Sequence, residues 1–390
     1  MNNLEETSDM SSGDPWKGAF RFVCWVYFSV LLLLVGLRIL FSTTVLLDLD
    51  RWALEVFWSV ASQILIMTFV PIVAMHVYFR KKDKENQVTI IKTASRFGLT
   101  RPAGRVIAWA FLLGAVLFLF NVFVSSFFNG ILMIFGYRFP AMMPETFYGV
   151  GGLFIGLLMI AVLPGLCEEV THRGMLLKGF ESKMGTMRAI LWTSVLFGFM
   201  HLNIVQFFYA TILGYMIALA VIATRNLWVG VIIHFVNNGI ATYMSFAGRY
   251  KWFGHNALEN LAGLFDGFGF IIYFGLVVGL FLAIMAIMHM FAKNTYNKNK
   301  RKHIEKLVRE NPMVLMRVDG GVYTIEEFVA IVDAMITKLS KWRAIKFYID
   351  ASTLYKPKPM NLDAKEKTLF VGVMVLGSLV TVFTLVWGFL

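Results

Sequence analysis

The chain has 390 residues, of which 58% are hydrophobic and only 15% are charged, and its mean hydropathy is +0.68. Soluble domains are usually about 45–50% apolar and about 25% charged, so this composition excludes an ordinary soluble enzyme. The net charge of +12 would fit nucleic-acid binding, but the sequence contains no nucleic-acid motif. In a membrane protein, basic loops beside anionic lipid explain such a charge. We therefore predict an all-α polytopic membrane protein that contacts lipid and binds no nucleic acid.

Apolar runs long enough to cross a bilayer recur along most of the chain. The first run follows an acidic segment and lacks a small-residue cleavage motif, so we expect a retained span rather than a signal peptide. We predict about eight or nine transmembrane helices around an intramembrane cavity. The predicted spans are 20–41, 56–79, 106–135, 148–166, 189–206, 207–224, 227–247, 264–292 and 368–390.

Lysine and arginine concentrate in alternate connections between these spans. Eight of them lie in the segment Arg80–Arg105, and others lie between the fourth and fifth spans and directly after Phe291. Alternating topology places these segments on one side, which the positive-inside rule identifies as cytoplasmic. We predict a multi-pass plasma-membrane protein, and a bacterial cytoplasmic membrane is the preferred location. The N-terminus is predicted in the cytoplasm and the C-terminus outside.

The segment 293–367 is the only sizeable polar part of the sequence. Strands are predicted at Met313–Val318 and Ile345–Ile349, and a helix at Thr324–Leu339. Thr324 and Glu327 form a capping-box pattern at the start of this helix. We predict a small α+β module on the cytoplasmic side that is structural or binds a partner protein.

Three short polar motifs interrupt the apolar spans. LPGLCEEVTHRG carries Glu168, Glu169 and Arg173, FGFMH carries His201, and HFVNN carries His234 and Asn238. An ionisable side chain at the centre of a span costs about 2.5–3.5 kcal/mol, so such residues usually face the bundle interior and often mark a functional site. A single polar residue is commonly a helix-packing contact, but three clusters on three spans favour a shared site.

Helical spacing separates the two acids of the first motif. Glu169 and Arg173 are four residues apart on one helix face, so we expect an ion pair that keeps Glu169 ionised. Glu168 lies about 100° around the helix and can point elsewhere, with His172 one turn away as a candidate partner. Pro164 is expected to kink the helix or to begin its irregular end.

These residue types suffice for the hydrolysis of an amide by activated water. A carboxylate in a partly dry cavity can act as a general base, and a nearby imidazole can orient the water or relay the proton. A second imidazole and an Asn amide can donate hydrogen bonds to a developing oxyanion. Alternatively, Glu168, His201 and His234 would make a two-His, one-carboxylate zinc site with an open position for water. No HExxH motif is present, and the spacing alone leaves both alternatives open.

The three motifs, in this order, resemble those of a known family. EEVTHR fits the pattern EExxxR, FGFMH fits FxxxH and HFVNN fits HxxxN. This pattern is similar to that of the CPBP family (CAAX proteases and bacteriocin-processing enzymes), also called Abi, which includes the type II CAAX prenyl endopeptidases. The resemblance covers about residues 95–245.

The resemblance implies an intramembrane glutamate protease that needs no cofactor. The roles that it implies are activation of water by Glu168, assistance by His201, oxyanion stabilisation by His234 and Asn238, and support by Glu169 and Arg173. The corresponding division of the chain is 1–94 for a tail and two transmembrane helices, 95–247 for the protease-like core, 248–292 for an additional transmembrane helix, 293–367 for the cytoplasmic module and 368–390 for a C-terminal transmembrane helix.

The resulting hypothesis is an intramembrane endopeptidase that cleaves a peptide or protein, lipidated or not, near the cytoplasmic face. One alternative is a non-catalytic membrane scaffold or bacteriocin-immunity protein that keeps the protease fold. Another is a proton-coupled transporter that uses the same acids and histidines as a relay. A transporter of that kind predicts inverted repeats, and the sequence shows none.

Overall fold

Helices account for all regular secondary structure in the part of the chain that the computed structural model describes. This part comprises residues 14–45, 51–84, 88–138, 147–257, 260, 269–310, 321, 324–352 and 361–387. Eight of its helical segments are long and apolar enough to cross a membrane. The prediction of an all-helical, polytopic membrane protein is therefore confirmed for the bundle.

The elements follow one another in three groups. The first group contains α1 (Phe20–Val45), α2 (Arg51–Val60), the π-helical segment η1 (Ala61–Phe69), α3 (Val70–Lys82), α4 (Ile90–Arg96) and α5 (Gly104–Ile134). The second contains α6 (Gly149–Gly156), η2 (Leu157–Val162), α7 (Leu163–Glu169), η3 (Val170–Leu176), α8 (Leu177–Met184), α9 (Thr186–Met200), α10 (Ile204–Thr224) and α11 (Leu227–Tyr250). The third contains α13 (Gly269–Glu310), α15 (Ile325–Thr337), α16 (Lys341–Ser352) and α17 (Ala364–Trp387).

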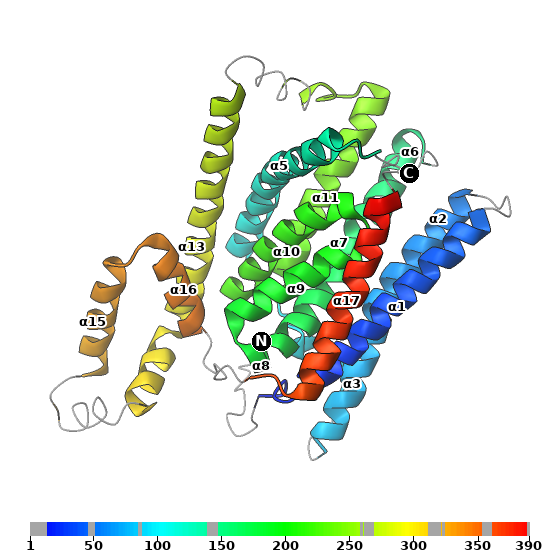
Figure 1. Ribbon diagram of the computed structural model, residues 1–390. Coiled ribbons are helices and arrows are strands. Elements are labelled where there is room, and N and C mark those ends of the chain that lie inside the picture. Colours follow the sequence, from blue (N-terminus) through cyan, green and yellow to red (C-terminus); the bar gives the residue numbers. More distant parts are fainter. Residues whose placement is uncertain are drawn as a thin grey trace.

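The helix α10 lies at the centre of the bundle (Figure 1). In its apolar window 61% of the residues are buried, against 22–44% for the other seven candidate spans. The helices α5, α9 and α11 pack against α10, and α1 and α17 pack against each other on one side of the bundle. The outer helices expose large apolar side chains, such as Leu379 and Phe383 of α17, which suits contact with lipid.

The motif LPGLCEEVTHRG lies inside one continuous helical run from α6 to α8. The predicted span 148–166 is therefore too short, and Pro164 does not begin an irregular end. Pro164 follows the π-helical turn of η2 and has no N–H for the carbonyl of Ile160, four residues earlier. That carbonyl instead accepts a hydrogen bond from Asn238 Nδ2 at 3.0 Å. A neighbouring helix thus supplies the donor that the proline lacks.

The helix α9 is shorter than expected. It has 15 residues, fewer than the roughly 20 that cross the hydrocarbon core, so the predicted span 189–206 is wrong in its extent. The link to α10 begins at His201, and Leu202 takes a left-handed backbone conformation with φ of 50°. Asn203 then caps α10, because its side-chain oxygen accepts a hydrogen bond from the Val205 amide at 2.9 Å.

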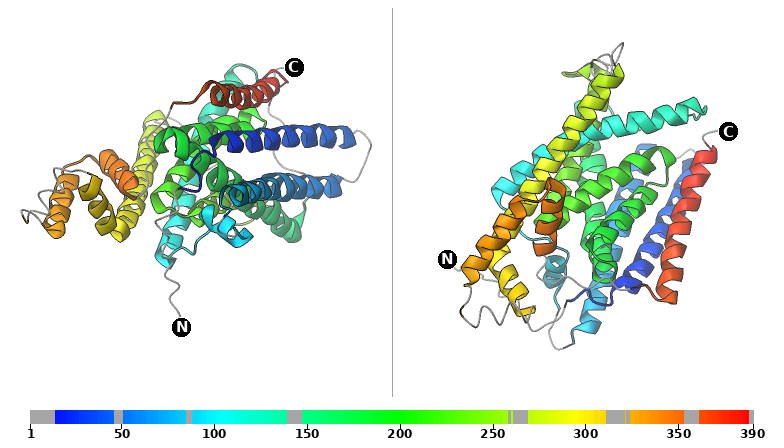
Figure 2. Two further views of the ribbon diagram at one scale, coloured as in Figure 1. Left: turned by 90° about the horizontal axis from the view of Figure 1, so that it is seen from below. Right: turned by 60° about the vertical axis from the view of Figure 1, so that its left-hand side comes forward.

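Beyond the bundle, α13 carries α15 and α16 beside it (Figure 2). The prediction of an α+β module is wrong for the described residues, which are helical. The predicted strand Ile345–Ile349 lies in α16, where four buried side chains follow helical spacing: Ala344, Ile345, Tyr348 and Ile349. The strand predicted at Met313–Val318 lies outside the described residues.

The start of α15 has the capping box that the sequence predicts. The Thr324 amide donates to the Glu327 carboxylate at 2.7 Å, and the Glu327 amide donates to the Thr324 hydroxyl oxygen at 3.2 Å. The hydrogen bonds from Thr324 lower the pKa of Glu327. This prediction is confirmed.

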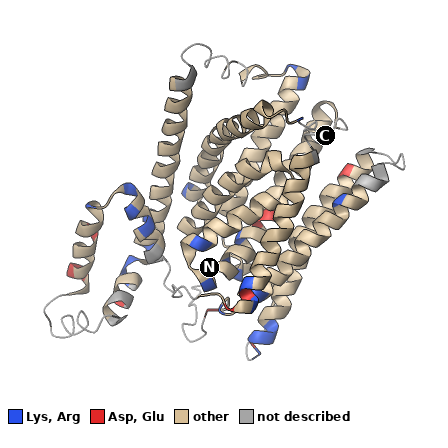
Figure 3. Cartoon of the chain, in the orientation of Figure 1, with Lys and Arg blue, Asp and Glu red and all other residues tan. Residues whose placement is uncertain are grey.

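Lysine and arginine gather at one end of the bundle (Figure 3). This end contains the C-terminal turn of α3, with Arg80, Lys81 and Lys82, and the start of α17, with Lys365 and Lys367. Lys183 of α8 also lies there and forms an ion pair with Glu366 at 2.9 Å. We call it the basic end of the bundle.

We predict that Asn238 stabilises the fold through the Ile160 carbonyl. The substitution Asn238→Ala leaves this carbonyl unpaired, which should lower the free energy of unfolding by about 1–3 kcal/mol. In a Pro164→Ala background, residue 164 has its own N–H, so the same substitution should cost much less. Thermal unfolding of the four proteins in detergent measures this coupling. Equal losses in the two backgrounds would contradict the assignment.

Candidate active site

The junction of α7 and η3 places a fully buried ion pair at the centre of the site. Glu169 Oε1 accepts a hydrogen bond from Arg173 Nη1 at 2.7 Å, as helical spacing predicts. The other terminal nitrogen of Arg173 donates to the Gly214 carbonyl of α10 at 2.8 Å. Both side chains are at most 1% exposed. Because an unpaired buried charge is costly, each of these groups depends on the other.

Glu169 also holds His234 of α11. His234 Nδ1 lies 3.0 Å from Glu169 Oε1, and an ionised carboxylate only accepts, so Nδ1 carries the proton. The close approach of α11 requires a glycine one turn before the histidine, since a Cβ at Gly230 would lie 2.8 Å from Glu169 Oε2. The imidazole is thereby fixed with its Nε2 pointing away from Glu169.

Glu168 points to the other side of the imidazole. Its Oε2 lies 3.9 Å from His234 Nε2 and accepts no hydrogen bond within the described part of the chain. Its Oε1 accepts a hydrogen bond from Gln63 Nε2 of η1 at 3.0 Å. Glu168 is 6% exposed. One oxygen of this buried carboxylate is thus held in place, while the other faces an imidazole nitrogen across a gap wider than a direct hydrogen bond.

Gln63 is a site residue that the motifs did not identify. It lies in the predicted span 56–79. The only indication of its role in the sequence is that a polar amide side chain occurs there among apolar residues. A second contact ties the same segment to the site, because the Thr171 hydroxyl donates to the Met67 carbonyl. The π-helical segments η1 and η3 therefore meet beside Glu168.

The Phe197 ring packs against all of the ring and guanidinium groups of the site. Its centroid lies 4.4 Å from the Arg173 guanidinium carbon and 5.7 Å, 5.1 Å and 4.9 Å from the centroids of His234, His201 and His172. The histidine contacts are edge-on, with interplanar angles of 74–90°. An aromatic face stabilises a desolvated cation, so the first residue of the FxxxH motif has a contact function of its own.

His201 contacts the Phe197 ring of this cluster and is half-buried. Its Nδ1 is 2.9 Å from the Phe197 carbonyl, so this nitrogen carries the proton and Nε2 faces away from its own helix. His201 and Glu168 are close enough to interact electrostatically. The structure therefore brings together five of the six predicted site residues: Glu168, Glu169, Arg173, His201 and His234.

Asn238 lies one helical turn beyond His234. Its Nδ2 donates to the Ile160 carbonyl, and its Oδ1 accepts from Asn237 Nδ2 at 3.0 Å. Both ends of its amide thus already have partners in the fold. The side chain of Asn238 thus links α11 to η2 rather than contacting Glu168.

His172 is fully buried and contacts the backbone of the site and a tyrosine of α1. Its Nδ1 lies 3.0 Å from the backbone carbonyl of Glu168, and its Nε2 lies 3.2 Å from the Tyr27 hydroxyl. The Tyr27 hydroxyl donates to the Leu196 carbonyl at 2.7 Å. The residue thus contacts the backbone of Glu168 rather than its carboxylate and lies away from the surface.

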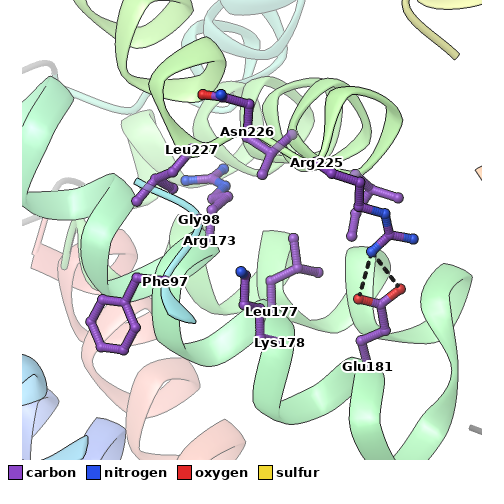
Figure 4. Close-up of a pocket in the computed structure, with 11 residues that line it drawn as sticks. Phe97, Gly98, Arg173, Leu177, Lys178, Glu181, Arg225, Asn226 and Leu227 are labelled. Atoms are coloured by element: carbon purple, nitrogen blue, oxygen red, sulfur yellow. Dashed lines mark hydrogen bonds and ion pairs between the residues drawn. The ribbon is translucent and has the colours of Figure 1, made fainter. Parts of the chain in front are cut away.

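A cavity of about 80 Å³ borders the site at the basic end (Figure 4). It lies between α8, the turn from α10 to α11 and the segment at Phe97 and Gly98. Arg173 forms part of its wall, opposite the ion pair between Arg225 and Glu181, which are 3.2 Å apart. Arg173 thus connects the buried carboxylates to the basic end.

The side-chain positions bear on the alternative of a zinc site at Glu168, His201 and His234. Within the described ranges, no group of three or more His, Cys, Asp or Glu side chains is placed to hold a metal ion. Glu169, rather than a metal, contacts His234 Nδ1. We derive no chemical step through a metal, and the alternative remains a prediction for experiment.

Comparisons with known proteins bear on the same segment. No curated protein and no solved structure matches the chain. A family model described as "type II CAAX prenyl endopeptidase Rce1-like" matches residues 150–240. The matched range contains all three motifs, whereas Gln63 lies outside it. Residues 150–240 thus resemble the Rce1-like type II CAAX prenyl endopeptidases, which confirms the resemblance to the CPBP family.

Proposed function

We propose that the chain is an intramembrane endopeptidase that hydrolyses a peptide bond with water activated by Glu168. The observation that carries this proposal is the alignment of Glu169, His234 and Glu168. The imidazole Nδ1 is 3.0 Å from one carboxylate, and Nε2 is 3.9 Å from the other. The family match supports protease chemistry for this segment.

In the proposed reaction, Glu168 Oε2 accepts a proton from the attacking water as the water oxygen bonds to the scissile carbonyl carbon. Gln63 holds the second oxygen of the same carboxylate, so the base keeps its orientation. The proton then passes from Glu168 to the leaving nitrogen, the C–N bond breaks, and Glu168 is regenerated as a carboxylate.

His234 has the position of an oxyanion donor. The carboxylate of Glu169 behind the ring stabilises the protonated imidazole, as an acid behind a catalytic histidine does. In that form Nε2–H is a donor near Glu168 Oε2, where negative charge develops on the carbonyl oxygen. Arg173 forms an ion pair with Glu169, and the half-buried His201 can orient the water or assist the proton transfer.

We further propose that cleavage occurs near the basic end, on the cytoplasmic side of the membrane. The supporting observations are the gathering of Lys and Arg at that end and the cavity that reaches Arg173. The positive-inside rule then places the N-terminus in the cytoplasm. A peptide or protein with a lipidated segment suits a site between apolar helices, and a bacterial cytoplasmic membrane remains our proposed location.

We predict that Glu168→Gln abolishes peptide cleavage. The amide keeps the size of the side chain but removes the base, and general-base catalysis typically contributes about 10²–10⁴-fold to the rate. The measurement is cleavage of prenylated and unprenylated reporter peptides by the purified protein in detergent. Glu181→Gln is the matched control, because Glu181 is a buried acid of the same helical run that pairs with Arg225 outside the site.

The outcomes separate the alternatives. Cleavage that is lost in Glu168→Gln, kept in Glu181→Gln and unaffected by a zinc chelator would support the metal-free mechanism. Cleavage that a chelator removes and zinc restores would move the chemistry to a metal. If the Glu168→Gln protein cleaves as well as the wild type, Glu168 is not the base. If neither protein cleaves and Glu168→Gln keeps the full cellular phenotype, the scaffold or immunity-protein alternative takes its place.

We also predict that Gln63 positions the base. Gln63→Met removes the donor to Glu168 at similar volume, and a hydrogen bond to a charged group is worth about 1.5–3 kcal/mol. We therefore expect kcat to fall about 10- to 100-fold with little change in KM. Ser62→Ala is the control, because that hydroxyl donates to the Ser59 carbonyl at the end of α2 rather than to Glu168. An unchanged kcat in Gln63→Met, or an equal loss in Ser62→Ala, would be evidence against this role.

A further inference from the structure

The helices α15 and α16 form an arm on the part of α13 that leaves the bundle (Figure 2). A cluster of aromatic rings joins α16 to α13. The Tyr348 ring lies 5.5 Å from the His289 ring and 5.2 Å from the Tyr296 ring, and the Phe347 ring lies 5.9 Å from Tyr296. These contacts fix the position of the arm along α13.

The turn between α15 and α16 exposes apolar and basic side chains together. We call this set the turn patch, and its members are Ile331, Met335, Leu339 and Trp342 with the basic residues Lys338, Lys341 and Arg343. The four apolar side chains are 37–63% exposed, and the three basic residues are exposed as well. Ile331, Met335, Lys338 and Leu339 are three or four residues apart, so they share one face of the helical segment and its end.

The turn patch lies where α13 leaves its apolar segment. The exposed surface of α13 is apolar up to Met290, and the first lysine after it is Lys293. His289 of α13 is close enough to both Lys293 and Lys341 to interact electrostatically. In Figure 1 the turn stands beside the middle of α13. The patch therefore lies beside the part of α13 where the sequence changes from apolar to basic, a pattern typical of a membrane–water boundary.

The charged side chains at the turn of the arm are all positive. The acids Glu326 and Glu327 lie at the opposite end of α15. Asp333, in the middle of α15, is ion-paired with Lys300 of α13. The turn patch thus presents cations and apolar side chains together, and anionic lipid headgroups with the outer acyl region complement both.

We propose that the turn patch is a membrane-docking surface that binds the anionic lipid headgroups around the protein, with Trp342 and Leu339 in the interface. Trp at the headgroup level and basic side chains that reach outward are the usual anchors at such a boundary. This inference does not depend on the proposed peptidase activity.

The test places a fluorescent label in the patch of the full-length protein. Met335→Cys provides the site, and an environment-sensitive thiol probe should react there selectively because the two native cysteines, Cys24 and Cys167, are buried. The labelled protein is compared in nanodiscs of phosphatidylcholine alone, in nanodiscs that also contain phosphatidylglycerol, and in detergent. Lipids that carry a quencher at the headgroup–acyl boundary report contact directly.

We expect a blue shift and strong lipid quenching in the phosphatidylglycerol nanodiscs. Each basic residue near an anionic surface changes the docked-to-undocked ratio about fivefold, so the triple variant Lys338→Gln/Lys341→Gln/Arg343→Gln should lower it about 100-fold. The control Lys81→Gln/Lys84→Gln/Lys92→Gln removes the same charge from exposed lysines around α3 and α4 and should leave the ratio unchanged.

Three results would overturn the proposal. The first is a probe that is equally exposed to water in all nanodiscs and escapes the lipid quencher. The second is a blue shift in detergent that grows with protein concentration, which would identify a second copy of the chain as the partner. The third is a shift that the control variant loses as fully as the patch variant, which would contradict a local docking surface.

Discussion

The site depends on one buried charge arrangement, the contact of Glu169 with Arg173 and His234. Two charges in an apolar bundle are stable only if each has good partners. Arg173 has the Glu169 carboxylate, the Gly214 carbonyl and the Phe197 face, so three helical segments meet at one guanidinium. The same carboxylate fixes the His234 ring. The interaction that makes the buried charge tolerable is thus also the one that aims an imidazole nitrogen at Glu168.

The π-helical segments explain how long apolar helices can carry such a site. A π-turn widens the helix by one residue and changes which side chains share a face, and such turns are frequent at functional sites. Here η1 carries Gln63, η2 contains the Ile160 carbonyl that Asn238 binds, and η3 carries Arg173. The irregular backbone is therefore placed where polar side chains from neighbouring helices can satisfy it, as the membrane interior requires.

The sequence predicted the parts of the site that follow from spacing within one helix. The pairing of Glu169 with Arg173 is an i,i+4 relation, and the capping box at Thr324 is equally local. Gln63 and Glu168 are 105 positions apart, so only the packed bundle brings them together. Asn238 matched a motif, but its hydrogen bond goes to the Ile160 carbonyl, which Pro164 leaves without a donor on its own helix. The strand expected at Ile345–Ile349 failed because a short apolar run with alternating residues also fits one face of a helix.

The position of the site within the bundle bears on how a substrate reaches it. Five residues of helix rise about 7.5 Å, so Glu168 is little more than one turn from Arg173, which borders the cavity at the basic end. The arm on α13 holds Lys341 of its turn patch near His289, four residues before that helix becomes basic at Lys293. If lipid binds the patch as we infer, it fixes the depth of the bundle at the end where the cavity reaches Arg173. A peptide anchored in that leaflet would then approach Glu168 from the side of this cavity.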